Sequence, residues 1–406
     1  MTGPIEPKSD TFADLKKPSL LTLIVLISYG SIGTALFTPA IPSVMDYFKV
    51  DAGVAQLTVM LFLLGYSIGQ LLFSPIAKRY GRKPALYIGI LLSIIGNFFC
   101  ILAGHLGALN LLILARFITS LGSSVGLSLT FMIISDYYSE SLARKITAYT
   151  MLAFAVVPGV GIAIGGFLVA YLGWNSCFYF LFIYGLFTLF LIYKLGETSR
   201  EIVRDSINVP RVLKAYLRDL KNPILLLYSI MIGTTTSVIY AFAATAPIIG
   251  IRIMGLRPDL YGIYNLIPAC GYFLGNFMAA RLSSVCKIKT VLKLGLFMMG
   301  FGTLIFAALF FLGYRNPWTL FLPVFLVYFG SPLFYSNAAV IATFRVPDKP
   351  NASSIMSFIN IGCAVVGLGL IGCFDEVPLI SLPLYFVFSV TTILFLFKRG
   401  IKLLED

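Results

Sequence analysis

The chain is built from long apolar runs that are separated by short polar segments. A membrane-spanning helix needs roughly 20 mostly apolar residues, and twelve runs have about this length: 20–42, 54–77, 85–104, 108–134, 147–172, 176–194, 223–249, 260–280, 290–313, 317–344, 353–373 and 378–397. The runs are continuous and do not alternate between apolar and polar positions, which excludes an outer-membrane barrel. The pattern predicts an all-α polytopic membrane protein with twelve transmembrane helices.

A charge-rich stretch in the middle divides the twelve spans into two sets of six. We expect a cytoplasmic N-terminal tail, a six-helix bundle, a cytoplasmic linker, a second six-helix bundle and a cytoplasmic tail, at 1–19, 20–194, 195–222, 223–397 and 398–406. The halves share a faint repeat, because Gly69 and Gly89 bracket one loop and Gly275 and Gly295 bracket the corresponding loop with the same spacing. Two pseudo-symmetric halves around a central site are a common plan for transporters.

Composition agrees with this class. The chain is 59% hydrophobic and 12% charged, with a mean hydropathy of +0.93, whereas soluble domains carry about 25% charged residues. The first apolar run is long and lacks a cleavage pattern of small residues, so we expect it to be a span and not a removed signal peptide.

The net charge of +13 follows from topology. With the N-terminus in the cytoplasm, 25 of the 30 Lys and Arg residues lie on cytoplasmic segments, and only Lys49, Arg252, Arg257 and Arg315 lie on external loops. This is the positive-inside bias of membrane proteins. It places both ends in the cytoplasm and makes membrane lipid, not nucleic acid, the partner of the basic residues.

The sequence contains no candidate residues for catalysis or for metal binding. The six cysteines are scattered and have neither a metal-ligand spacing nor a disulfide pattern. The spans contain no nucleophile–base pair and no metal cluster. We therefore expect no enzyme activity, no metal and no cofactor.

The loop after the second span has a distinctive sequence, Gly69 to Pro84, that ends in Lys-Arg-Tyr-Gly-Arg-Lys-Pro. A glycine at position 81 permits a tight turn between two helices, and Arg82 and Lys83 favour the cytoplasmic side. The loop resembles the signature of the major facilitator superfamily.

Three more segments are similar to this family. They are Arg116 to Ser120 in span four, Pro158-Gly159 with Gly165-Gly166 in span five, and Gly196-Glu197-Thr198 after span six. The span-five segment resembles the Pro- and Gly-rich segment of antiporters, where small residues permit close packing and helix bending. Over residues 36–200 the chain resembles the Bcr/CflA drug-resistance subfamily, and the resemblance is thin in the second half.

The resemblance implies the major facilitator fold and a monomeric secondary transporter in the bacterial inner membrane. It also implies an exporter of drugs or metabolites that uses protons as the coupling ion. Some positions depart from the family pattern: the signature Asp is Lys78, its small Gly is Ser74, and the Asp of span one is Ala35.

Because the signature loop is altered, the residues that could form a cytoplasmic gate have two interpretations. Gly81, Arg82 and Lys83 are the candidate gate residues, together with Asp136 at the end of span four. Arg82 could pair with Asp136 and replace part of the missing contact. The alternative is two separate charges in solvent.

Arg116 is the one charged residue away from the ends of the spans, and all 17 acidic residues fall outside the spans or at their ends. A buried arginine is costly and is rarely kept without a partner. It could bind an anionic group of the substrate or take part in coupling, next to Ser120 at i+4. It could instead hydrogen-bond to backbone carbonyls of a broken neighbouring helix.

The other polar residues in the spans are neutral. Together they suggest a central cavity that is polar but not acidic, with these candidates: Tyr29, Thr34, Tyr240, Tyr264, Asn265, Tyr335, Asn337 and Asn360. As single residues they are equally compatible with helix-to-helix hydrogen bonds.

Three functions stay open. The first is the exporter that the resemblance implies, although the absence of a carboxylate within the spans weakens proton coupling. The second is an importer or facilitator of a polar anion or zwitterion, such as a carboxylate siderophore, nucleoside or amino acid, recognised by Arg116. The third is a membrane receptor that does not transport.

Overall fold

The structure is a computed structural model that describes residues 18–199, 217–344, 349–374 and 377–405. Most of the predicted N-terminal tail and linker therefore lies outside the described residues. Within the described ranges every regular element is a helix. The first half comprises α1 (Leu20–Ala35), η2 (Thr38–Ala40), α2 (Ile41–Phe48), α3 (Ala52–Tyr80), α4 (Arg82–Leu106), α5 (Leu109–Ser123), α6 (Val125–Tyr137), α7 (Glu140–Leu172) and α8 (Ser176–Tyr193).

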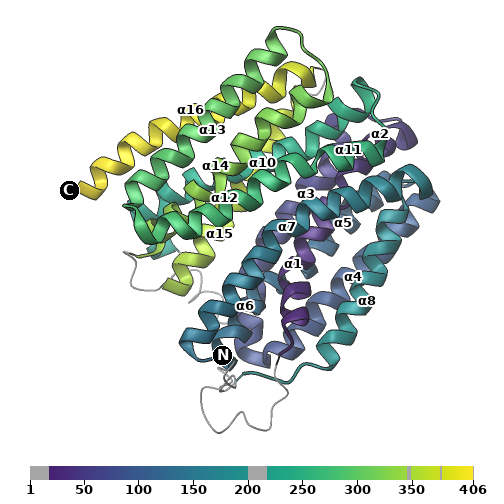
Figure 1. The fold of residues 1–406 in the computed structure, drawn as a ribbon. Helices are drawn as coiled ribbons and strands as arrows, with labels where there is room; N and C mark the ends of the chain where they lie inside the picture. Colours follow the sequence, from purple (N-terminus) through teal and green to yellow (C-terminus); the bar gives the residue numbers. More distant parts are fainter. Residues whose placement is uncertain (1–17, 200–216, 345–348, 375–376, 406) are drawn as a thin grey trace, which may run out of the picture.

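The second half contains the remaining helices: α10 (Pro223–Pro247), η4 (Ile248–Ile253), α11 (Pro258–Tyr264), α12 (Leu266–Val285), α13 (Ile288–Phe311), α14 (Pro317–Phe344), α15 (Lys349–Gly372) and α16 (Pro378–Glu405). Figure 1 shows the two halves as two bundles that lie side by side, the first in purple to teal and the second in green to yellow.

Eleven stretches of helix in the described chain are long and apolar enough to cross a membrane. They coincide with eleven of the twelve predicted spans and confirm the all-α polytopic class. The remaining predicted span, 260–280, falls on α11 and α12, which are separated at Asn265. Pro268 lacks the amide hydrogen that would bond to the carbonyl of Tyr264, so the helix is interrupted at this point.

The apolar cores distinguish the two ends of the molecule. We call the end where α1 begins and α8 ends the terminal side, and the opposite end the far side. On the terminal side each half has its own core, around Leu23, Ile133 and Ile192 in the first half and around Leu225, Leu292 and Phe397 in the second. No cluster among the described residues joins the halves there.

On the far side the cores are shared between the halves. One cluster combines Leu36 and Leu63 of the first half with Ile248 and Leu368 of the second. Another combines Ile162 with Ala246 and neighbouring residues of the second half. The bundles are therefore closed against each other on the far side and have separate cores on the terminal side, in agreement with their convergence near α2 and α11 in Figure 1.

Candidate functional site

The signature loop forms a tight turn that is held by charges. Gly81 joins α3 to α4 with φ +100°, a conformation that favours glycine. Arg82 Nε donates to Asp136 Oδ2 at 2.8 Å, and the two side chains are 14% and 20% exposed. Arg82 Nη1 also donates to Ser199 Oγ at 2.9 Å. The residues form an ion pair, so they are not two separate solvated charges, and their role as a gate stays a prediction.

Glu197 holds the same turn, and the sequence interpretation did not assign it a role. Its Oε1 accepts hydrogen bonds from the amides of Arg82 and Ser199 at 2.9 and 2.8 Å, and its Oε2 accepts one from the amide of Lys83 at 3.0 Å. The carboxylate thus binds free amides in the first turn of α4, where a negative charge is favourable. The signal in the sequence was the Gly-Glu-Thr segment after span six. Lys83 Nζ donates to the carbonyl of Tyr193 at 3.0 Å, also within the first half.

Arg116 lies fully buried inside the first bundle. Its Nη1 donates to the carbonyl of Gly33 at 2.8 Å and its Nε to that of Thr58 at 3.4 Å. The guanidinium stacks over the rings of Phe62 at 4.2 Å and Phe37 at 4.7 Å. Its Nη2 is enclosed without a hydrogen-bond partner among the described residues. Gly33 belongs to the last turn of α1, so this geometry matches the second hypothesis, a bond to a broken neighbouring helix.

The other predicted residues of the first half also lie within the bundle. Tyr29 stacks on Tyr184 with ring centroids 5.4 Å apart. Thr34 donates to the carbonyl of Gly30 at 3.2 Å, and Ser120 donates to that of Phe117 at 2.8 Å. These three hydroxyl-bearing side chains contact their own half, and the structure does not bring them together with the candidates of the second half.

Several predicted residues of the second half are likewise dispersed. Tyr264 stacks on Phe321 at 5.8 Å, and Asn265 lies at the break between α11 and α12. Asn337 accepts a hydrogen bond from Ser283 at 3.2 Å and joins α12 to α14. Asn360 is buried on α15, and its Oδ1 has no partner in the described chain.

Tyr240 and Tyr335 behave differently, because they lie together between the halves. Both phenols lie within electrostatic reach of Tyr66, which belongs to the first half, and of Tyr272 on α12. Tyr328 joins this group, with its ring 6.3 Å from that of Tyr272. The sequence interpretation missed Tyr66, Tyr272 and Tyr328, because nothing in a single apolar run marks which tyrosines face the other half.

The seam between the halves on the far side involves the Pro- and Gly-rich segment of α7. This helix continues without interruption through Pro158, and helix bending stays a prediction. A Cβ at Gly159 would lie 2.3 Å from Ala269 Cβ, and a Cβ at Gly166 would lie 2.3 Å from the carbonyl oxygen of Pro258, both in the second half. Gly165 packs instead on the carbonyl of Leu36 in its own half. Two of these small residues therefore permit the close approach of the bundles.

Polar contacts cross the same seam. Gln56 Nε2 donates to Thr245 Oγ1 at 3.3 Å. At the outer rim Arg252 lies 3.7 Å from Asp46 across the halves. Arg257 donates to the hydroxyl of Tyr171 at 3.2 Å.

The rim also contains an ion pair within the second half. Arg257 donates to Asp259 at 2.9 Å. The bond to Tyr171 and then the Asp259 carboxylate raise the pKa of the Arg257 guanidinium. An arginine is protonated at physiological pH in any case, and these two partners stabilise its charge further.

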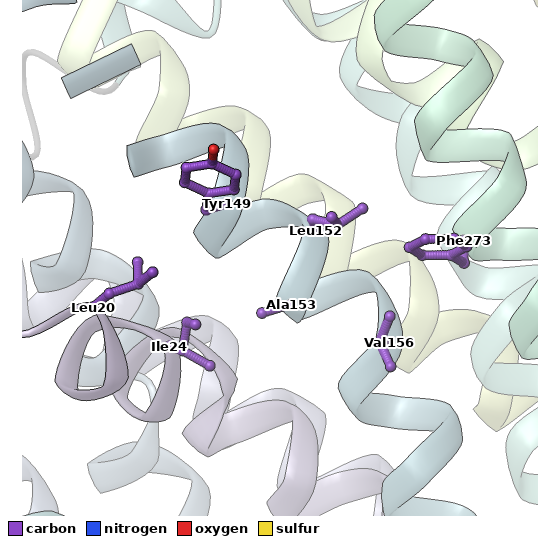
Figure 2. A pocket seen from close by; sticks show the side chains of 7 residues that line it. All are labelled: Leu20, Ile24, Tyr149, Leu152, Ala153, Val156 and Phe273. Carbon is purple, nitrogen blue, oxygen red and sulfur yellow. The ribbon is translucent and has the colours of Figure 1, made fainter. Parts of the chain in front are cut away.

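An apolar pocket of about 400 Å³ opens between α1, α7 and α12. Figure 2 shows Leu20 and Ile24 from α1, Tyr149 to Val156 from α7 and Phe273 from α12 around it. It has almost no polar atoms to orient a solute, so it does not itself form the candidate site. Within the described residues no group of His, Cys, Asp or Glu is arranged to hold a metal ion.

Comparison with known proteins places these features in a family. The family model described as Major Facilitator Superfamily matches residues 21–397. The chain is 29% identical to an uncharacterized transporter of Rickettsia felis over 72% of its length and 71% of the relative. It is 23% identical to the bicyclomycin resistance protein homolog of Haemophilus influenzae, covering 94% and 97% of the two chains. It is 24% identical to multidrug resistance protein D of Escherichia coli over 79% of both.

Solved structures give the same fold. A crystal structure of a D-xylose-proton symporter has a TM-score of 0.71 at 16% identity and covers 93% of this chain and 97% of its own. The xylose transporter XylE from E. coli in an inward open conformation also has a TM-score of 0.71 at 16% identity, with 93% and 95% covered.

The relatives are named transporters and resistance proteins, in line with the prediction that the chain is not an enzyme, and they support the resemblance to the Bcr/CflA subfamily. The chain belongs to the Major Facilitator Superfamily of secondary transporters.

Proposed function

We propose that the chain exports a small organic solute, a drug or a metabolite, across the bacterial inner membrane by alternating access. The observation that carries this proposal is the asymmetry of the cores, which are shared between the halves on the far side and separate on the terminal side. Two rigid halves that can close at either end around a midplane site are what alternating access requires.

Orientation follows from the charges. The basic residues concentrate on the terminal side, so this side faces the cytoplasm under the positive-inside rule. The described conformation then offers its site to the cytoplasm, where an exporter loads. The relatives named for bicyclomycin and multidrug resistance support the direction of transport.

The importer alternative depends on Arg116 as the anion site. In the described conformation its guanidinium is enclosed by the first bundle and binds carbonyls of its own half. An anion between the halves would not reach it, so we favour the exporter. Proton coupling rests on the resemblance alone.

A reversible lock tests the proposal. In a variant without native cysteines, Asp46→Cys and Arg252→Cys are joined by a thiol-specific crosslinker, since the native side chains approach to 3.7 Å across the far seam. Inverted membrane vesicles, whose cytoplasmic face points outward, should accumulate radiolabelled chloramphenicol, an uncharged drug, under a proton gradient. The crosslink should abolish accumulation, and a cleavable linker should restore it on reduction.

The matched control carries one cysteine only, treated in the same way. Flux that survives the crosslink would exclude alternating access around this seam. Binding of the drugs without any flux would identify the non-transporting receptor instead.

A further inference from the structure

Five tyrosines gather between the halves near the middle of the spans. Tyr66 lies on α3, Tyr240 on α10, Tyr272 on α12, and Tyr328 and Tyr335 on α14. Tyr66 and Tyr240 pack in one core that both halves share. The hydroxyl of Tyr328 bonds to the carbonyl of Ile239, next to Tyr240, and the rings of Tyr328 and Tyr272 lie 6.3 Å apart. The phenol of Tyr335 lies within electrostatic reach of Tyr66, Tyr240 and Tyr272. We call these residues the tyrosine cluster. Both halves contribute polar side chains to it.

Two members have a fixed position. The hydroxyl of Tyr328 donates to the carbonyl of Ile239 at 3.2 Å, and its ring meets the ring of Tyr272 edge to face. Tyr66 packs its ring over Gly30 of α1, where a Cβ would lie 2.3 Å from the ring, and lies parallel to Phe62. The rings are therefore oriented by their neighbours before any solute arrives, which lowers the entropic cost of binding.

Three hydroxyls of the cluster are available to bind a solute. Tyr66, Tyr240 and Tyr335 make no hydrogen bond through their hydroxyls to any described residue, and these oxygens are not among the enclosed, unpartnered atoms of the protein. They contrast with Tyr29 and Tyr261, whose hydroxyls are enclosed. The three phenols therefore present donors and acceptors to accessible space.

Among the described residues, the side chains that act electrostatically on the cluster are uncharged. The groups that act electrostatically on Tyr66, Tyr240, Tyr272 and Tyr335 are other tyrosines and Asn276, with no acidic or basic side chain among them. Arg116 is sealed inside the first bundle. A charged solute at this depth would lack a counter-ion, and an uncompensated buried charge costs several kcal/mol.

We propose that the tyrosine cluster is the solute site and that it takes uncharged solutes with several hydroxyl or amide groups and an apolar or aromatic face. The phenol hydroxyls bind the polar groups and the rings pack on the flat face. This inference rests on the proposed transport function, because it assigns the site that alternating access would expose. It also gives Tyr66 a specificity role, since it is the member of the cluster that the first half contributes.

Three probes that share one scaffold and differ in charge test the solute class. The probes are chloramphenicol, which is uncharged, its deacylated amine in a buffer acidic enough to keep it protonated, and its succinate half-ester, which is anionic. Binding to the purified protein is measured by the shift in melting temperature. We expect the uncharged probe to bind at least tenfold more tightly than either charged probe.

The site is tested with hydroxyl deletions. Tyr66→Phe, Tyr240→Phe and Tyr335→Phe each remove one donor and keep the ring, and each should weaken binding of the uncharged probe about five- to tenfold, the value of one hydrogen bond. The matched control is Tyr228→Phe, which removes a hydroxyl from the same helix as Tyr240, within the separate core of the second half. It should bind the probe like the wild type.

The outcomes separate the two proposals. Tighter binding of either charged probe, no binding of the uncharged one, or wild-type affinity in all three cluster variants would overturn the uncharged-solute site. Vesicles that accumulate the charged amine would leave export standing while the solute class fails. Binding of the uncharged probe by the cluster without flux would leave the site standing while transport fails.

Discussion

Arg116 shows how far the sequence leads at the scale of a single residue. A lone arginine in an apolar run is visible as costly, and the sequence therefore singled it out. Two roles were open, because its partner depends on where α1 ends and on what surrounds the guanidinium. The structure places the carbonyl of Gly33 and the rings of Phe37 and Phe62 there. No spacing along span four encodes those neighbours.

Replacement of Arg116 separates the two roles. Arg116→Ala removes the hydrogen bond to a last-turn carbonyl of α1 and leaves a cavity, so we expect the free energy of unfolding to fall by about 1–3 kcal/mol. Arg116→Lys, which keeps a charged donor, should lose less. Thermal unfolding of the purified variants measures both. An unchanged melting temperature, together with lost binding of anionic solutes, would return Arg116 to the anion hypothesis.

Arg82 and Asp136 allow a second test at the same scale. Their pair is mostly buried, so its coupling should lie between that of surface pairs and that of fully buried ones, at about 1–2 kcal/mol. A double-mutant cycle of Arg82→Gln and Asp136→Asn measures it. Arg79→Gln, on an exposed side chain of the same loop, is the control, and a coupling near zero would mean that the pair contributes nothing.

At the scale of helices, the apolar pattern predicted the spans well and their interruptions poorly. The length and continuity of an apolar run are set by the bilayer, so eleven predicted spans correspond to helices that can cross it. The break at Asn265 and the turn through Thr38 and Pro39 depend on single prolines. A proline inside a run can leave a helix continuous, as Pro158 does in α7. The run alone does not tell these cases apart.

The N-terminus of α4 gives a prediction about one helix end. Glu197→Ala removes the acceptor of the Arg82 and Lys83 amides and should lower the free energy of unfolding by about 2 kcal/mol, and Glu197→Gln, which keeps one oxygen, by about 1 kcal/mol. Hydrogen exchange should show faster exchange at these two amides in both variants. Thr198→Ala is the neighbouring control. Unchanged exchange in Glu197→Ala would mean that another group caps α4.

At the scale of the whole molecule, the sequence predicted two sets of six spans but not on which side the halves share their cores. Both ends of each half must be able to pack against the other half in a transporter that alternates, so the apolar pattern does not select one state. The shared far-side cores and the tyrosine cluster arise only when two halves of separate sequence meet. Tyr66 and Tyr240 are 174 positions apart in the chain, and nothing in a single sequence relates them.

One added methyl group on the far side should shift the equilibrium between the state in which the halves are closed there and the state in which they are open. In the described state a Cβ at Gly166 would lie 2.3 Å from the carbonyl oxygen of Pro258, which is fixed backbone of the other half. Gly166→Ala therefore opposes closure of the far side and leaves the state in which that side is open unaffected, so the population should move toward the latter. Gly161→Ala is the control on the same helix, because its Cβ would meet Ala35 at an ordinary 3.4 Å. Spin labels on either side of the far seam, read by pulsed dipolar spectroscopy, should report longer distances in Gly166→Ala and wild-type distances in Gly161→Ala. Identical distance distributions in both variants would mean that the backbone at Pro258 moves locally to accommodate the methyl group. The contact would then not control the position of one half relative to the other.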